Sequence, residues 1–206
     1  PVAICRTATT INLVGDTTSP IPAKNFDEGS YDCCIDRFEV KRMSEDDTLF
    51  RPSITFNCSD ITEMVVMRVW DCSGNSNTCM ISVNIQDKVK PFIVGPPNLS
   101  IECNALDNKS LSVSYLNSKF GKIVIGSATR DSIRIDKYND GTNDLVGVGI
   151  DGYSTDNCGV PTITQTFIPS INSCGIGTII RTFVVTDKTG LRDSVKQYIT
   201  IQNSKP

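Results

Sequence analysis

The chain has 206 residues, of which 39% are hydrophobic, and carries a formal net charge of −3 at pH 7. This length suits one or two globular domains, and the acidic balance argues against nucleic acid, which requires a basic face. No run approaches the roughly 18 apolar residues of a membrane-spanning helix. Histidine is absent, which excludes Ser-His-Asp triads, Cys-His dyads and histidine-ligated zinc.

The chain begins PVAICRTATTINLV, without the basic segment and apolar stretch of a signal peptide. It also contains nine cysteines, a number typical of oxidising compartments because cytosolic reductants keep thiols open. We therefore expect an internal part of a longer exported protein that is located outside the cell or on its surface, with no membrane insertion of its own.

An internal repeat organises the sequence. Two registers, separated by a difference in loop length, superpose one half on the other. We predict two domains, residues 1–90 and 91–206, with an insertion at about 104–149 in the second. The matched pairs are Cys58/Cys174 and Asp71/Asp187 at a shift of 116, and Asp27/Asp151, Asp32/Asp156 and Cys34/Cys158 at a shift of 124.

Short strands with period-2 alternation dominate both halves, and no stretch shows a capped 3.6-residue period. Each half has a hairpin in which Asp opens the turn and Gly occupies the position that needs a positive φ. About 90 residues per copy favour an immunoglobulin-like sandwich. The predicted fold is all-β, with two tandem immunoglobulin-like modules braced by disulfides. The clearest predicted strands are 65–70, 80–86, 181–186 and 196–202.

The cysteines are expected to form disulfides, since their spacing does not fit a zinc site. Cysteines that recur in both halves are paired within each half. Two that flank one hairpin turn, and are both replaced in the other half, are paired with each other. Adjacent cysteines in an extended segment face opposite ways, so they need different partners. The predicted bridges are Cys34–Cys58, Cys158–Cys174, Cys72–Cys79 and Cys5–Cys33, and Cys103 is left unpaired.

Several motifs carry a family resemblance. FDEGSYDCC, VWDCSGNSNTC and VNIQDKVKP occur in the first half, and TDNCG (155–159) and RTFVVTDKTG (181–190) in the second. In combination they resemble hyalin-repeat-like, immunoglobulin-like modules that form long arrays in surface proteins of Bacteroidota. The resemblance spans nearly the whole chain apart from residues 104–149. It implies a structural spacer or adhesive repeat of a large exported protein.

Carboxylates precede a cysteine in both halves: Asp27, Glu28 and Asp32 recur as Asp151 and Asp156. Calcium takes six to eight oxygen ligands, and such loops are candidate calcium sites. The alternative is Asx-turn and backbone capping, which needs no metal.

A second candidate calcium loop consists of Asp136, Asp140 and Asp144. It matches several positions of an EF-type loop but has Tyr138 and Gly147 where the third and twelfth ligands belong. An Asp-Gly turn between two strands explains the same residues without metal.

The insertion, 104–149, is the predicted binding segment, because insertions in repeat arrays lie in loops; the alternative is a hairpin that only pads the sandwich. We expect no catalysis: Asp71 and Asp187 lie in different domains and cannot flank one bond. The expected function is a structural or adhesive repeat of an extracellular filament or cell-surface protein, with neighbouring modules or identical subunits as partners and a cell-surface glycan as a further ligand. The alternatives are an accessory carbohydrate- or protein-binding module of a secreted enzyme, and a hydrolase that uses carboxylates of the insertion.

Overall fold

The structure, a computed structural model, describes residues 1–106, 111–126, 134–135, 144–145 and 151–203. It divides into two compact units, Pro1–Lys88 and Val89–Pro206, which we call module one and module two. The expected boundary followed residue 90. No helix in the described part of the chain is long and apolar enough to cross a membrane.

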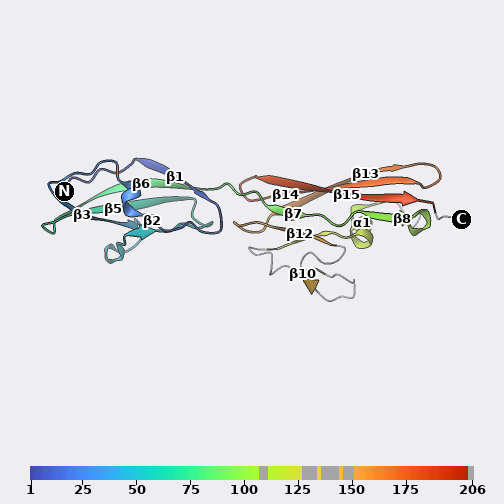
Figure 1. Cartoon of the computed structure of the whole chain (residues 1–206), viewed down its shortest axis with the longest axis horizontal. Helices are drawn as coiled ribbons and strands as arrows, with labels where there is room; N and C mark the ends of the chain where they lie inside the picture. Colours follow the sequence, from blue (N-terminus) through green and yellow to red (C-terminus); the bar gives the residue numbers. More distant parts are fainter. Residues whose placement is uncertain (107–110, 127–133, 136–143, 146–150, 204–206) are drawn as a thin grey trace. The chain divides into compact units, whose positions relative to one another are not determined.

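Module one contains a four-stranded sheet in the order β1-β6-β5-β3 and a two-stranded sheet of β2 and β4 (Figure 1). β1 runs parallel to β6, whereas β5 is antiparallel to both β6 and β3. The strands are β1 Ala8–Leu13, β2 Ile21–Pro22, β3 Ile35–Arg42, β4 Ser53–Ile54, β5 Thr62–Asp71 and β6 Ser76–Asp87, with 3-10 helices at Ala23–Phe26 and Asp47–Leu49.

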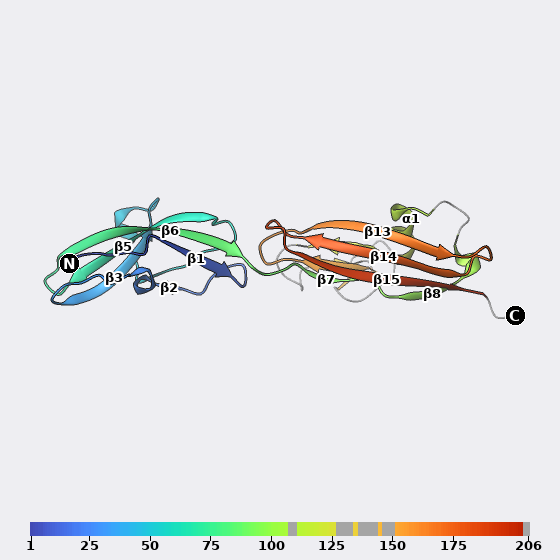
Figure 2. The ribbon, with the colours of Figure 1, turned by 90° about the horizontal axis from the view of Figure 1, so that it is seen from above.

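Module two repeats this arrangement with a four-stranded sheet in the order β13-β14-β15-β8, whose strands lie side by side in Figure 2. β8 is parallel to β15, as β1 is to β6. A three-stranded sheet, β7-β12-β9, accompanies it. The strands are β7 Phe92–Val94, β8 Leu99–Glu102, β9 Ile123–Ile125, β10 Arg134–Ile135, β11 Asp144–Leu145, β12 Gly152–Thr155, β13 Thr162–Ile171, β14 Gly177–Thr186 and β15 Arg192–Gln202, with a 3-10 helix at Cys103–Ala105.

The four strands predicted from alternation are confirmed, because they lie within β5, β6, β14 and β15. Gly74 and Gly190 in the two hairpin turns have φ values of 85° and 90°, a region that glycine enters without steric cost. The predicted all-β fold of two immunoglobulin-like modules is therefore correct.

The core contains the residues that alternation directs inward. In module two, Phe183 and Val185 on β14 pack with Ile93 and Ile123 of the smaller sheet. In module one, the alternate positions of β5 and β6 are buried in the same way. These inward positions, each at most 6% exposed, are Val65, Met67, Val69, Ile81, Val83 and Ile85.

An α-helix in the insertion, α1 (Val113–Phe120), was not expected. The Ser112 side chain caps it by accepting a hydrogen bond from the Tyr115 amide, and Gly121 ends it at a φ of 87°. Leu116 and Phe120 are buried against Ile179 of the large sheet. Eight residues are too few to show a clear 3.6-residue period in the sequence, and the tertiary contacts supply the missing stability.

A buried arginine connects α1 to the large sheet. Arg181 on β14 is completely buried and donates hydrogen bonds to Gln197 Oε1 on β15 at 2.6 Å and to Asn117 Oδ1 on α1 at 2.5 Å. Gln197 Nε2 donates to the Phe120 carbonyl oxygen. Burial lowers the pKa of Arg181 to about 10. Part of the insertion is therefore integral to the module and does not merely pad it.

The structure contains different disulfides from those predicted. Cys5 is bonded to Cys79, and Cys34 to Cys72. The expected Cys5–Cys33, Cys34–Cys58 and Cys72–Cys79 bridges are therefore wrong. Cys33 is an exposed free thiol.

Strand register explains both observed bridges. Parallel pairing of Ala8 with Ser82, continued three residues back along both strands, places Cys5 opposite Cys79. Antiparallel pairing of Ile35 with Asp71, continued by one residue, places Cys34 opposite Cys72. The predicted bridges followed from the correspondence between the repeats and from the residues that flank the hairpin turn, and neither of these determines the strand register.

The same geometry excludes the predicted Cys72–Cys79 bridge. Cys79 is paired with Met67, five positions before Cys72, so the two cysteines lie about 17 Å apart along the ladder. A disulfide joins Cα atoms that lie within about 7 Å of each other.

In module two the expected Cys158–Cys174 bridge is also wrong, because Cys174 is a free thiol. Cys158 precedes β13 and Cys174 follows it, so a strand of ten residues, about 33 Å long, separates them. Cys103 is a partly exposed free thiol that lies 3.7 Å from Asn203 Oδ1.

Candidate functional site

Two of the predicted calcium ligands, Asp27 and Asp151, accept hydrogen bonds from backbone amides in loops. Asp27 Oδ1 accepts from the Ser30 amide. Glu28 makes a main-chain contact, in which its amide donates to the Ile4 carbonyl. Asp151 Oδ1 accepts from the Lys122 amide at 2.7 Å. These contacts correspond to the alternative of backbone capping.

The second predicted calcium loop lies mostly outside the described residues. Asp136 and Asp140 are not among the described residues, whereas Asp144 is the first residue of β11. The calcium prediction for this loop stays a prediction.

The outer face of the large sheet in module one carries a ladder of charged and aromatic side chains. Glu39 on β3 accepts hydrogen bonds from Arg68 Nη2 at 2.7 Å and from Trp70 Nε1 at 2.8 Å. The Arg68 guanidinium lies 3.8 Å from the Phe50 ring centroid and 4.9 Å from that of Trp70. Partial burial raises the pKa of Glu39, but the hydrogen bonds from Trp70, Arg68 and Arg37 outweigh it and hold the pKa below its ordinary value.

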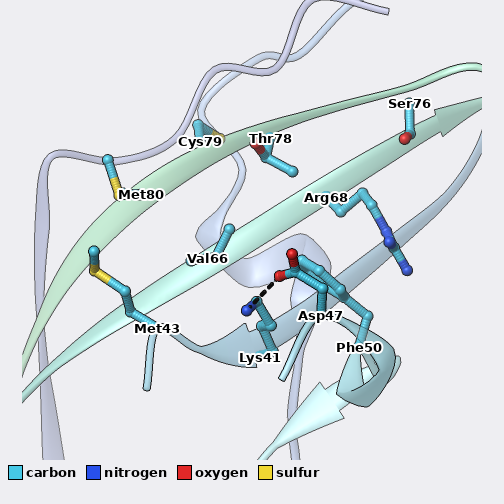
Figure 3. A pocket seen from close by; sticks show the side chains of 10 residues that line it. All are labelled: Lys41, Met43, Asp47, Phe50, Val66, Arg68, Ser76, Thr78, Cys79 and Met80. Atoms are coloured by element: carbon cyan, nitrogen blue, oxygen red, sulfur yellow. Dashed lines mark ion pairs between the residues drawn. The ribbon is translucent and has the colours of Figure 1, made fainter. Parts of the chain in front are cut away.

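A pocket of about 410 Å³ lies beside this ladder (Figure 3). The Lys41 ammonium pairs with Asp47 Oδ1 at 2.6 Å, as the dashed line in Figure 3 shows. Arg68 is occupied by Glu39 and by two aromatic rings. The charged groups therefore bind one another, which makes the pocket a poor site for an ionic ligand or for acid–base chemistry. Its lining residues are Lys41, Met43, Asp47, Phe50, Val66, Arg68, Ser76, Thr78, Cys79 and Met80.

A pair of carboxylates beside the hairpin turn is the stronger candidate. In module one, Asp71 Oδ1 accepts hydrogen bonds from the Ser73 and Asn75 amides at 2.9 and 2.8 Å. Asp32 Oδ1 caps the Cys34 amide. Asp71 uses both oxygens in its turn, because Asp71 Oδ2 accepts a hydrogen bond from Asn75 Nδ2.

In module one the Pro1 nitrogen lies 3.0 Å from Asp32 Oδ2 and 4.0 Å from Asp71 Oδ2. The pKa of Asp71 is lowered, chiefly by the hydrogen bond from the Asn75 side chain.

Module two contains the corresponding pair at the same places in the repeat. Asp187 Oδ1 accepts from the Thr189 and Leu191 amides, both at 2.8 Å. Asp156 Oδ2 accepts from the Cys158 amide at 3.1 Å. Asp156 is 5% exposed and Asp187 is 7% exposed. One carboxylate oxygen of each lies within 4.8 Å of the other.

Asp156 is among the calcium ligands predicted from the sequence, whereas its neighbour Asp187 is not. Asp187 was considered only as one half of a catalytic pair with Asp71, and these two residues lie in different modules. The two shifts of the repeat were a usable signal, because Asp32 and Asp71 of one half recur as Asp156 and Asp187 of the other. Only the fold shows that the members of each pair meet.

Comparisons with known proteins find similarity only among solved structures. No protein-family model matches the chain, and no curated protein matches it in sequence. One similar structure is Drosophila N-cadherin EC1-4, with 11% identity and a TM-score of 0.33 over 95% of this chain. Another is protocadherin gamma C5 EC1-3, with 10% identity and a TM-score of 0.28 over 96% of this chain and 67% of that one. The chain spans about half of the N-cadherin fragment, 47% of its length.

Proposed function

We propose that the chain is a non-catalytic structural and adhesive repeat of a long protein that is located outside the cell or on its surface. Its partners are neighbouring modules of the same chain and identical subunits of a filament. The disulfides support the location, because such bonds persist in oxidising compartments. The resemblance to hyalin-repeat-like modules agrees with this role.

The Cys5–Cys79 bridge is the observation that carries the proposal. It joins residues 74 positions apart in a unit that ends at Lys88. Tension that enters near Pro1 and leaves near Lys88 passes through this bond and bypasses the enclosed residues. A module built in this way stays folded under load while its ends are pulled.

Strand direction acts in the same sense. In module two, β8 and β15 are parallel neighbours. In module one, β1 and β6 are parallel as well, but β1 lies between Cys5 and Cys79 and bears load only after reduction. Pulling the start of the first strand away from the end of the second loads their hydrogen bonds together, in shear. Bonds that are loaded together resist more force than bonds that open one after another.

Single-molecule stretching tests this role. The oxidised chain, held at its two ends, is expected to release little length from module one. Reduction is expected to free the residues between Cys5 and Cys79, about 27 nm at 3.6 Å per residue. A Cys33→Ser variant, which removes a free thiol, is the control and should extend like the wild type.

Two outcomes would contradict the proposal. The first is an oxidised chain that extends by the full length of module one. The second is saturable, tight binding of a defined glycan on an array, which would favour an accessory binding module of a secreted enzyme.

A further inference from the structure

We propose that Asp156 and Asp187 of module two bind a hard divalent cation of the calcium type. This site goes beyond the mechanical role proposed above and does not depend on it. Both carboxylates are more than nine-tenths buried, and their ligand oxygens lie within 4.8 Å of each other. Two negative charges this close in a buried place repel each other unless a cation or a proton joins them.

The second oxygen of Asp187 gives independent support. Asp71 Oδ2 accepts a hydrogen bond from Asn75 Nδ2 at 2.9 Å, whereas Asp187 has Leu191 at the matching place, which has no side-chain donor. In the described part of the structure Asp187 Oδ2 is buried and accepts no hydrogen bond. A buried carboxylate oxygen without a donor is costly, and a metal ion satisfies it.

The geometry suits calcium chemistry. Two oxygens up to 4.8 Å apart can both lie at the 2.3–2.6 Å distance that Ca²⁺ takes to oxygen. Hydrogen bonds from backbone amides orient both carboxylates. Asp156 accepts from the Cys158 amide, and Asp187 accepts from the Thr189 and Leu191 amides. Preoriented ligands lose little entropy when the ion binds.

Calcium titration of the complete chain tests the site. Titration calorimetry with CaCl₂ in a chelator-treated buffer is expected to show binding, and the melting temperature is expected to rise when calcium replaces EDTA. Asp187→Asn keeps an oxygen that can cap the turn but removes the charge, so calcium affinity should fall at least tenfold. Asp156→Asn should lower the calcium affinity by a similar factor. This variant provides the test if Asp187→Asn does not fold.

The matched control is Asp71→Asn, the same substitution at the corresponding turn of module one. It should leave the calcium response of the wild-type chain unchanged. The proposal is overturned if the wild-type chain shows no binding heat at 10 mM CaCl₂, on the order of the weakest calcium sites of extracellular modules. In that case the ammonium of Lys188, which lies beside Gly159, is the neutralising charge. A response that survives both Asp187→Asn and Asp156→Asn overturns it as well, because the ion then binds elsewhere.

Discussion

At the scale of single residues, the charged side chains of module one are arranged in networks and not in isolated pairs. Glu39 accepts hydrogen bonds from Arg37, Arg68 and Trp70. The Arg68 guanidinium also lies close to the rings of Phe50 and Trp70. Hydrogen bonds to a charged group contribute more than neutral ones, and partial burial reduces their screening. The ladder therefore stabilises the outer face of the sheet.

The lowered pKa of Glu39 leads to a pH-dependent prediction. Glu39→Gln should lower the free energy of unfolding by roughly 1–2 kcal/mol at pH 7, since it weakens the charge-assisted bonds. A carboxylate with a depressed native pKa contributes stability above its unfolded pKa of about 4.3, and this contribution is lost as the pH falls through the native pKa. The difference between variant and wild type should therefore shrink towards pH 3 in urea unfolding curves.

Asp36→Asn is the control for this experiment. Asp36 pairs with Arg37 at the surface, where both side chains are about half exposed (47% and 51%). Its removal should change stability by less than about 0.5 kcal/mol at either pH. A pH-independent loss in the Glu39 variant would show that packing, and not charge, maintains the ladder.

At the scale of elements, the two modules differ most where α1 packs. Arg181 and Gln197 of module two match Val65 and Ile81 of module one under the 116-residue shift. Val65 and Ile81 are buried apolar residues, whereas Arg181 and Gln197 are buried polar residues bonded to α1. An insertion and a pair of core substitutions thus form one structural unit.

We predict that Arg181→Met detaches α1. The substitution removes the donors to Asn117 and Gln197, and buried acceptors without donors cost about 1–3 kcal/mol each. Stability should fall by at least about 2 kcal/mol, and the amides of α1 should exchange faster in hydrogen-exchange experiments. The strands of module one should keep their protection.

Arg192→Met provides the comparison, because Arg192 is exposed at the start of β15. This variant should lie within about 0.5 kcal/mol of the wild type. Unchanged exchange of the α1 amides in the Arg181 variant would show that Leu116 and Phe120 alone hold the helix.

At the scale of the whole molecule, the cysteine connectivity determines how the chain responds to reduction. Both bridges described above lie in module one. Cys5–Cys79 joins the segment before β1 to β6, and Cys34–Cys72 joins the residue before β3 to the turn after β5. A cross-link stabilises mainly by restricting the unfolded chain, and the effect grows slowly with loop length.

The double variant Cys5→Ser/Cys79→Ser should therefore lose roughly 2–4 kcal/mol of stability. Hydrogen exchange should rise in β1 and β6 and stay unchanged in β13, β14 and β15. Peptide mapping of the oxidised wild type should recover Cys5 linked to Cys79 and Cys34 linked to Cys72. A Cys72–Cys79 peptide in that map would contradict the strand register described here.

The sequence by itself determined the repeat, the positions of the long strands and the identity of the core residues. These depend on local patterns. A two-residue period places alternate side chains on the buried face of a strand, independently of the rest of the chain. The residues buried in this way include Met67, Val69, Phe183 and Val185. Asp and Gly mark the turns for equally local reasons.

Only the tertiary structure decided which distant residues meet. The partners of Cys5 and Cys34 follow from the register between strands that are far apart in the chain, and the sequence period contains no information on that register. Helix α1 forms because Leu116, Phe120 and Asn117 find the large sheet, which outweighs its short length. The pairing of Asp156 with Asp187 arises in the same way, since the fold brings two turns together and leaves their carboxylates side by side.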